Sequence, residues 1–159
     1  MSTPVSTVDA ARTALYTLIN GETAVSLQPA LTIAKPGVYL GLPAGQNLPD
    51  DIIAIGSRVQ QRSEPHNLVG GGGSYWLLEQ YTIDVMVSCY RGGDDQSQAW
   101  SRMVALVAAV DDAIRQDPSL GNVIGVSWPA GHDYNLAYVE DHKGWLADCE
   151  ISVMVKSLP

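Results

Sequence analysis

Hydrophobic and polar residues alternate through residues 77–90, in a run long enough to be a full strand. The apolar set is Leu77, Tyr81, Ile83, Val85, Val87 and Cys89, and the polar set between them is Gln80, Thr82, Asp84 and Ser88. Successive side chains of a strand point to opposite faces, so a period of two predicts one buried and one polar face. This pattern is typical of an antiparallel sheet, because strands of parallel sheets are buried on both faces.

A long amphipathic helix is predicted directly after this strand. Apolar residues recur at spacings of three and four over residues 99–114, which predicts a helix with one wide apolar face. Asp94 or Asp95 is placed to cap its first turn. Pro118 cannot continue a helix, so the chain is expected to turn over residues 117–121. Strand, short loop, helix and turn thus form the central unit of the chain.

The other elements are predicted on both sides of this unit. A first helix is expected over residues 8–19, capped by Ser6 or Thr7 and ending at Asn20 and Gly21. Strands are expected over residues 25–27, 37–42, 52–60, 123–128, 135–140 and 145–156. Pro129 is expected to end one of them, and His132 to lie in a turn. The order predicts an α+β fold with an antiparallel or mixed β-sheet and two main helices packed on one face.

The 77–90 strand is long for a chain of this size. The 159 residues are expected to form one domain over residues 1–159, with a diameter of about 40 Å. Fourteen strand residues span about 46 Å, so the strand should bend or project. We expect a projecting β-hairpin over residues 53–80, whose apolar residues would be buried only against another subunit.

The tip of that hairpin would hold four consecutive glycines, Gly70, Gly71, Gly72 and Gly73. Ordering four glycines costs much backbone entropy, so we expect a mobile loop unless a partner orders it. A phosphate-binding loop would require a Lys and a Ser or Thr opening a helix, whereas here Ser74, Tyr75 and Trp76 open a strand. Nucleotide binding is therefore not predicted.

The chain is acidic, with a formal net charge of -8. Residues 1–75 hold four basic and five acidic groups, a balance of -1, and residues 76–159 hold five and twelve, a balance of -7. An acidic half argues against wrapping nucleic acid, because DNA-binding surfaces neutralise phosphates with Lys and Arg. We read no signal peptide and no membrane-spanning run, and so expect a cytoplasm-like compartment, or a particle assembled there.

Candidate chemistry is sparse. Cys89 and Cys149 lie on the apolar faces of their strands, which favours buried free thiols, although a disulfide stays open if the two strands are neighbours in register. His132-Asp133 and Asp141-His142 could together form a metal site, but solvated turns account for both pairs. Adjacent acids at 50–51, 94–95 and 111–112 are interpreted as solvated groups or helix caps. We predict no catalytic residue, no metal site and no cofactor.

Aromatic residues gather at the predicted strand ends and loop margins. They are Tyr75, Trp76, Tyr90, Trp128, Tyr134 and Tyr138. Trp and Tyr are enriched where one protein surface buries another, but they also pack at the edges of cores. Both interpretations stay open for the set. Tyr75, Trp76, Tyr90 and the glycines at 70–73 are our candidate residues for subunit or partner contacts.

The series of strand, Tyr90-Arg91-Gly92-Gly93-Asp94-Asp95, helix and Asp117-Pro118-Ser119-Leu120-Gly121 resembles the tail terminator, or tail completion, proteins of long-tailed bacteriophages. The resemblance extends from about residue 7 to residue 156. It implies a virion protein of the tail and neck, assembled in the host cytoplasm, that forms a homohexameric ring on the tail tube. Such a ring stops polymerisation of the tail tube protein and offers a docking surface to the head connector.

In such a ring DNA passes through the lumen as cargo and is not bound specifically, which an acidic inner wall favours. We expect Asp94, Asp95, Glu140 and Asp141 to contribute to that wall, with Asp148 and Glu150 as further candidates. Two alternatives stay open. One is a head-closure or other neck protein at the head-tail interface, and the other is a small cytoplasmic enzyme or ligand-binding domain with a concave polar pocket.

Overall fold

The computed structural model describes residues 6–21, 36–61, 68–69, 76–77 and 79–157 of the chain, and of the pairs at 68–69 and 76–77 only the backbone. Its elements are α1 (Val8–Asn20), β1 (Gly37–Leu40), β2 (Asp51–Gln61), β3 (Leu68–Val69), β4 (Trp76–Leu77), β5 (Glu79–Gly92), α3 (Gln96–Gln116), β6 (Val126–Val139) and β7 (Gly144–Ser157). The predicted α+β fold is confirmed.

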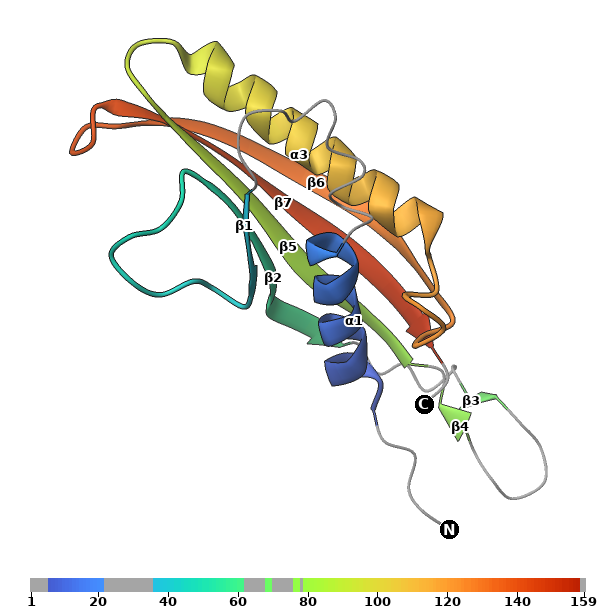
Figure 1. The fold of residues 1–159 in the computed structure, drawn as a ribbon. Helices are drawn as coiled ribbons and strands as arrows, with labels where there is room; N and C mark the ends of the chain where they lie inside the picture. Colours follow the sequence, from blue (N-terminus) through green and yellow to red (C-terminus); the bar gives the residue numbers. More distant parts are fainter. Residues whose placement is uncertain (1–5, 22–35, 62–67, 70–75, 78, 158–159) are drawn as a thin grey trace.

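Five strands form one mixed sheet in the order β1-β2-β5-β7-β6. The β1–β2 pair is parallel and the other neighbours are antiparallel. Both α1 and α3 lie on the same face of this sheet (Figure 1). Helix α1 packs on β1 and β2, whereas α3 packs on β5, β7 and β6. The short strands β3 and β4 pair with each other in a separate two-stranded sheet.

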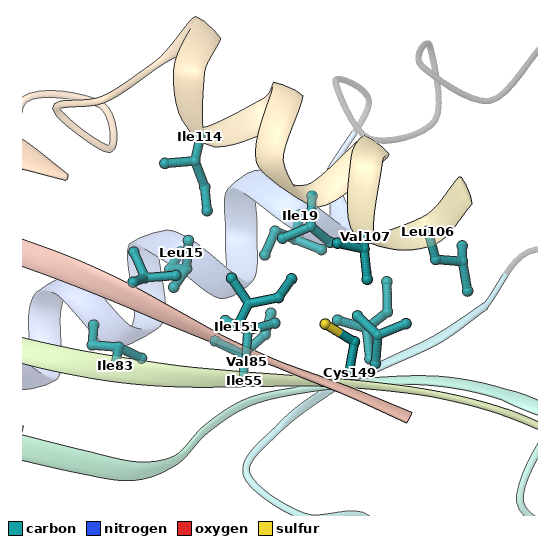
Figure 2. Packing of buried hydrophobic residues seen from close by; sticks show 14 of the residues in the cluster. Leu15, Ile19, Ile55, Ile83, Val85, Leu106, Val107, Ile114, Cys149 and Ile151 are labelled. Atoms are coloured by element: carbon teal, nitrogen blue, oxygen red, sulfur yellow. The ribbon is translucent and has the colours of Figure 1, made fainter. Parts of the chain in front are cut away.

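The core fills the layer between the helices and the sheet. On the sheet side, the helix-facing residues of β5 and β7 alternate with polar ones, and Val85 lies directly opposite Ile151. Leu15 of α1 and Leu106 of α3 point into this layer from the other side (Figure 2). All four side chains are at most 1% exposed. The apolar faces read from the sequence therefore meet one another as predicted.

The first helix is attached to the sheet through its N-terminal residue. Thr7 occupies the cap position but makes no side-chain cap bond. Its hydroxyl instead donates to Glu79 Oε2 at 2.6 Å, and its backbone N–H donates to the same oxygen at 2.8 Å. Ser6 Oγ accepts from the Val8 N–H at 3.3 Å. The predicted cap residues thus lie at the helix start, and Thr7 joins α1 to β5.

The predicted end of a strand at Pro129 is wrong. One continuous strand, β6, replaces the two strands that we predicted over residues 123–128 and 135–140, so His132 lies in a strand and not in a turn. A register shift falls between Pro129 and Gly131. Proline is tolerated there because β6 is an edge strand among the described strands, with β7 as its neighbour, and a bulge removes the need for its missing N–H.

The first part of the expected projecting hairpin lies inside the sheet. Strand β2 pairs with β5 from Asp51 opposite Cys89 onward, and Ile53 and Ile55 are at most 3% exposed. The expectation that this strand is covered only by another subunit is therefore wrong. The glycines at 70–73 and the predicted strand at 25–27 lie outside the described residues, so the extension beyond β2 stays a prediction.

The length of β5 is accommodated by the shape of the whole sheet. Strands β5, β6 and β7 each have 14 residues, and they run side by side along the long axis of the molecule (Figure 1). We expected a bend or projection because we assumed a spherical molecule of about 40 Å in diameter, whereas the molecule is elongated (Figure 1). At one end of this elongated sheet, two turns that are distant in the sequence meet.

The core makes a direct prediction for stability. Val85→Ala removes two buried methyl groups at a fully buried position and should lower the free energy of unfolding by about 2 to 3 kcal/mol, because transfer and cavity terms add. Val123→Ala is the matched control at a 38% exposed position and should change it by less than about 0.5 kcal/mol. Urea unfolding followed by circular dichroism measures both, and equal effects would contradict the described core.

Candidate functional site

Two turns meet at one end of the sheet, where β5 leads into α3 and β6 leads into β7 (Figure 1). Gly92 lies opposite Gly144, and the Gly93 N–H donates to the Lys143 carbonyl at 3.1 Å. Tyr90 adds a bond from its hydroxyl to the His142 carbonyl at 2.5 Å. A Cβ at position 144 would lie 2.6 Å from the Arg91 carbonyl oxygen, so this close approach requires glycine.

The four acids predicted to act together lie in these two turns. They are Asp94, Asp95, Glu140 and Asp141, which we call the acidic end, and all four are exposed. Asp95 also caps α3, because its Oδ1 accepts from the Ser97 hydroxyl at 2.5 Å and from the Ser97 N–H at 3.0 Å. These hydrogen bonds, first the hydroxyl and then the backbone one, lower the pKa of Asp95. A change at Asp95 therefore affects both charge and helix capping.

A buried ion cluster lies beside the acidic end, between β2, β5 and α3. Arg91 donates to Asp51 from both Nη atoms, Nη1 to Oδ1 at 2.7 Å and Nη2 to Oδ2 at 3.1 Å. Arg102 Nε reaches Asp51 Oδ2 at 2.7 Å. Asp51 is 5% exposed, so this carboxylate is almost removed from water. The cluster joins the end of β5 to the start of β2 and to the first half of α3.

Burial and neighbouring charges shift the pKa values of Asp51 and of both cysteines. Burial alone would raise the pKa of Asp51, but the hydrogen bonds and charges of Arg91 and Arg102 outweigh it and hold the pKa below its ordinary value. Burial, and then the neighbouring Asp51, raises the pKa of the Cys89 thiol to about 12. Cys149, which is also free and buried, has a pKa raised by burial to about 11.

Our interpretation of the adjacent acids as solvated groups is wrong for Asp51, which is buried and paired with two arginines. The sequence contained a signal for it, because Asp51, Ile53 and Ile55 fall on the same face of a period-two strand. Arg91 continues the buried face of β5 in the same way, two residues after Cys89. A charged residue in phase with a buried row predicts a buried partner of opposite charge.

Asp111 and His132 form the second long-range pair that the sequence did not reveal. His132 Nε2 lies 2.8 and 3.0 Å from the two carboxylate oxygens of Asp111 on α3. The sequence had paired His132 with Asp133, but neighbouring residues on a strand point to opposite faces. Within the described ranges, no group of three or more His, Cys, Asp or Glu side chains could hold a metal ion.

The aromatic residues of β6 form a partly exposed row beside α3. Tyr134 stacks on His132 with ring centroids 6.0 Å apart, and it lies 5.9 Å from Trp100 of α3. Tyr138 meets Trp145 edge to face at 5.3 Å. Both Tyr134 and Tyr138 remain 44% exposed, so the row presents aromatic surface to the solvent.

The remaining aromatic candidates are spread over other parts of the molecule. Trp128 lies on the helix-free face of β6, with the Lys156 ammonium 5.7 Å from its ring. Tyr90 lies at the acidic end, as described above. Only the backbone of Trp76 is described, in β4, while Tyr75 and the glycines at 70–73 lie outside the described residues.

The face of the sheet away from the helices carries carboxylates from three adjacent strands. Glu150 of β7 lies directly opposite Asp133 of β6, and both are exposed. Asp148 follows on the same face of β7, and Asp84 of β5 is close enough to Glu150 to interact with it. Burial, and then Glu150, raises the pKa of Asp84. This face therefore presents negative charge where no described helix covers it.

An open groove of about 830 Å³ lies between α1 and the turn after α3. Among the described residues its lining is mostly small or apolar, and Asp117 is the one charged residue there. Asp117 already accepts from the Gly121 N–H at 2.8 Å and from the Ser119 hydroxyl at 3.0 Å. The described lining therefore does not bring together an acid, a base and a nucleophile. No helix in the described part is long and apolar enough to span a membrane.

The comparison with solved structures finds matches to this chain. No protein-family model matches the chain, and no curated protein matches it. Among solved structures, its fold is similar to that of a chain in the structure described as "Virion of native gene transfer agent (GTA) particle", with a TM-score of 0.53 and 14% sequence identity. The match covers 98% of this chain and 100% of that chain. At this identity the likeness shows a shared fold, over the full length of both chains.

The ion cluster generates a prediction with a defined pH dependence. Asp51→Asn leaves two arginines without their carboxylate and should lower the free energy of unfolding by about 3 kcal/mol or more at neutral pH. Since the folded pKa of Asp51 lies below the unfolded value, its stabilisation is present above about pH 4 and is lost as the pH falls through the folded value.

The difference between wild type and Asp51→Asn should therefore shrink in acid, which urea unfolding at a series of pH values measures. Asp50→Asn, at the exposed neighbouring position, is the control and should stay within about 0.5 kcal/mol of wild type throughout. A difference that stays constant with pH would contradict the assignment of the stabilisation to an ionised Asp51.

Proposed function

We propose that the chain is a structural protein of a virion, and more specifically a tail terminator. In this role identical copies close a ring on the last ring of the tail tube, stop its growth and present a surface to the head connector. The observation that carries the proposal is the full-length fold match to a chain of a virion particle. It is supported by the strand, Gly-Gly-Asp-Asp, helix and Asp-Pro series through which the sequence resembles that family.

The proposed mechanism is geometric and needs no bond to be made or broken. A ring of identical subunits requires two different surfaces on each copy that meet at a fixed rotation. DNA must pass without adhering, and carboxylates oppose adhesion because they repel phosphates and offer no cation to neutralise them. The grouping of Asp94, Asp95, Glu140 and Asp141 at one end of the sheet supports their proposed place on the lumen wall. The helix-free face adds Asp133, Asp148 and Glu150 as candidates.

A head-closure or other neck protein of the same particle is the main alternative. An assay of tail tube growth distinguishes these two roles. Purified chain added to polymerising tail tube protein should give capped tubes of limited length, seen by electron microscopy as an extra ring at one end. A head-closure protein should leave tube growth unchanged, since only a terminator caps the growing tube. Uncapped tubes of unlimited length at excess protein would contradict the tail terminator proposal.

The proposed lumen wall is tested by reversing charge without breaking the helix cap. The triple variant Asp94→Lys, Glu140→Lys and Asp141→Lys keeps Asp95, which caps α3. Particles should still assemble, but DNA delivery should fall by about tenfold or more, because each lysine adds a phosphate contact.

The matched control reverses two acids elsewhere, Asp9→Lys on α1 with Asp112→Lys on α3, and should deliver DNA normally. Particle counts by electron microscopy and titres of DNA transfer measure the two steps separately. Normal DNA transfer by the triple variant would contradict the proposal that these residues lie on the lumen wall.

A further inference from the structure

The two edges of the sheet carry different exposed apolar surfaces. At the β1 edge, Leu40 is 42% exposed, and the loop that follows it exposes Leu42 at 66% and Leu48 at 40%. This loop, residues 41–50, stands out from the sheet on the side of β1 (Figure 1). We call these three leucines the leucine edge. A large apolar side chain that is two-thirds exposed on a projecting loop contributes little to the fold of its own chain.

The opposite edge presents the aromatic row together with the flank of α3. Trp100, Val104, Tyr134 and Tyr138 are 39%, 41%, 44% and 44% exposed, and we call them the aromatic edge. Among the described strands, β7 is the one neighbour of β6, so the outer side of this 14-residue strand pairs with none of them. A long edge strand with exposed aromatics is a template for another chain.

We propose that the leucine edge of one copy docks on the aromatic edge of the next copy. The inference rests on the proposed function, which requires a closed ring, and it identifies the two surfaces that close it. They are unlike each other and lie on opposite sides of one elongated sheet. A contact between unlike surfaces is heterologous and leaves a free edge at each end of any pair, so that copies continue to add until the ring closes.

Charge favours this pairing over a two-fold contact between aromatic edges. Strand β6 carries one charged residue when histidine is neutral, Asp133, which lies near the middle of the strand. Two such strands brought together would place acid against acid, which is unfavourable. Contact with the opposite edge avoids this repulsion.

The leucine edge does not carry the same negative charge. Asp50 is the one charged residue among residues 36–50. Arg12 of α1 lies close to the start of the loop, because it donates to the Gly56 carbonyl at 2.8 Å and its Nη2 lies 3.1 Å from where a Cβ at Gly41 would stand. Arg12 offsets the charge of Asp50, so this edge can meet an acidic neighbour without repulsion between like charges.

Two single variants, studied alone and mixed, test the pairing. Leu42→Asp places a carboxylate on the leucine edge and leaves the aromatic edge intact, while Tyr134→Asp does the reverse. Wild-type chain should form a closed oligomer in sedimentation velocity and native mass spectrometry. Each variant alone should self-associate about thirtyfold or more weakly, the effect of losing one central interface side chain.

The mixture of the two variants is the decisive sample. Each retains one intact edge, so together they should form a dimer that cannot grow, with one copy of each variant. Val123→Asp, at a similarly exposed apolar residue outside both edges, is the control and should assemble like wild type. Circular dichroism and thermal unfolding should show that all variants fold. If Tyr134→Asp does not fold, Tyr138→Asp takes its place.

Three results would overturn the pairing. A wild-type chain that stays monomeric, or binds only another protein, would do so. Loss of association in Tyr134→Asp alone, with Leu42→Asp unaffected, would indicate a two-fold contact between aromatic edges. Normal oligomers from both variants would exclude these edges and leave the tail terminator proposal standing. Oligomers that follow the expected pattern but fail to cap tubes would confirm the pairing and contradict the tail terminator role.

Discussion

Burial of one face of the β5–β7 pair beneath α3, with α1 covering the neighbouring β1 and β2, is the interaction on which the rest of the structure depends. These strands are the centre of the sheet, and their helix-facing side chains, among them Val85, Val87 and Ile151, are fully buried. Because side chains alternate, every residue between them is directed to the helix-free face, where the polar set accumulates. The same alternation carries Arg91 and Asp51 to the buried side, where each charge requires a partner.

Elements with a strong internal period could be predicted from the sequence, and elements defined by their neighbours could not. Strands β5 and β7 and helices α1 and α3 follow from their own periodicity. Strand β6 was missed because Pro129 is a strand breaker unless the strand lies at an edge, and edge position is a property of the whole sheet. Asp51 with Arg102, and Asp111 with His132, are pairs that only the tertiary arrangement brings together.

The predicted surface residues divide in the same way. Asp94, Asp95, Glu140 and Asp141 lie in two turns 45 or more positions apart in the sequence, yet strand register brings these turns to one end. The exposed aromatics could not be assigned to core or surface from sequence, because β6 alternates without a continuous apolar face. Their place beside α3, and the leucines at the opposite edge, became visible only once the strand order was known.

The two buried thiols give the folded molecule an unusual chemical property. Alkylating reagents attack the thiolate, and a pKa of about 12 for Cys89 and about 11 for Cys149 leaves almost none of it at neutral pH. Both sulfurs also lie beneath the helices, out of contact with solvent. Alkylation of Cys89 and Cys149 in the native chain therefore requires the helices to separate transiently from the sheet. The rate of this alkylation reports how often the central layer opens locally. A cysteine engineered at the surface would be alkylated while the two native thiols stay unreactive.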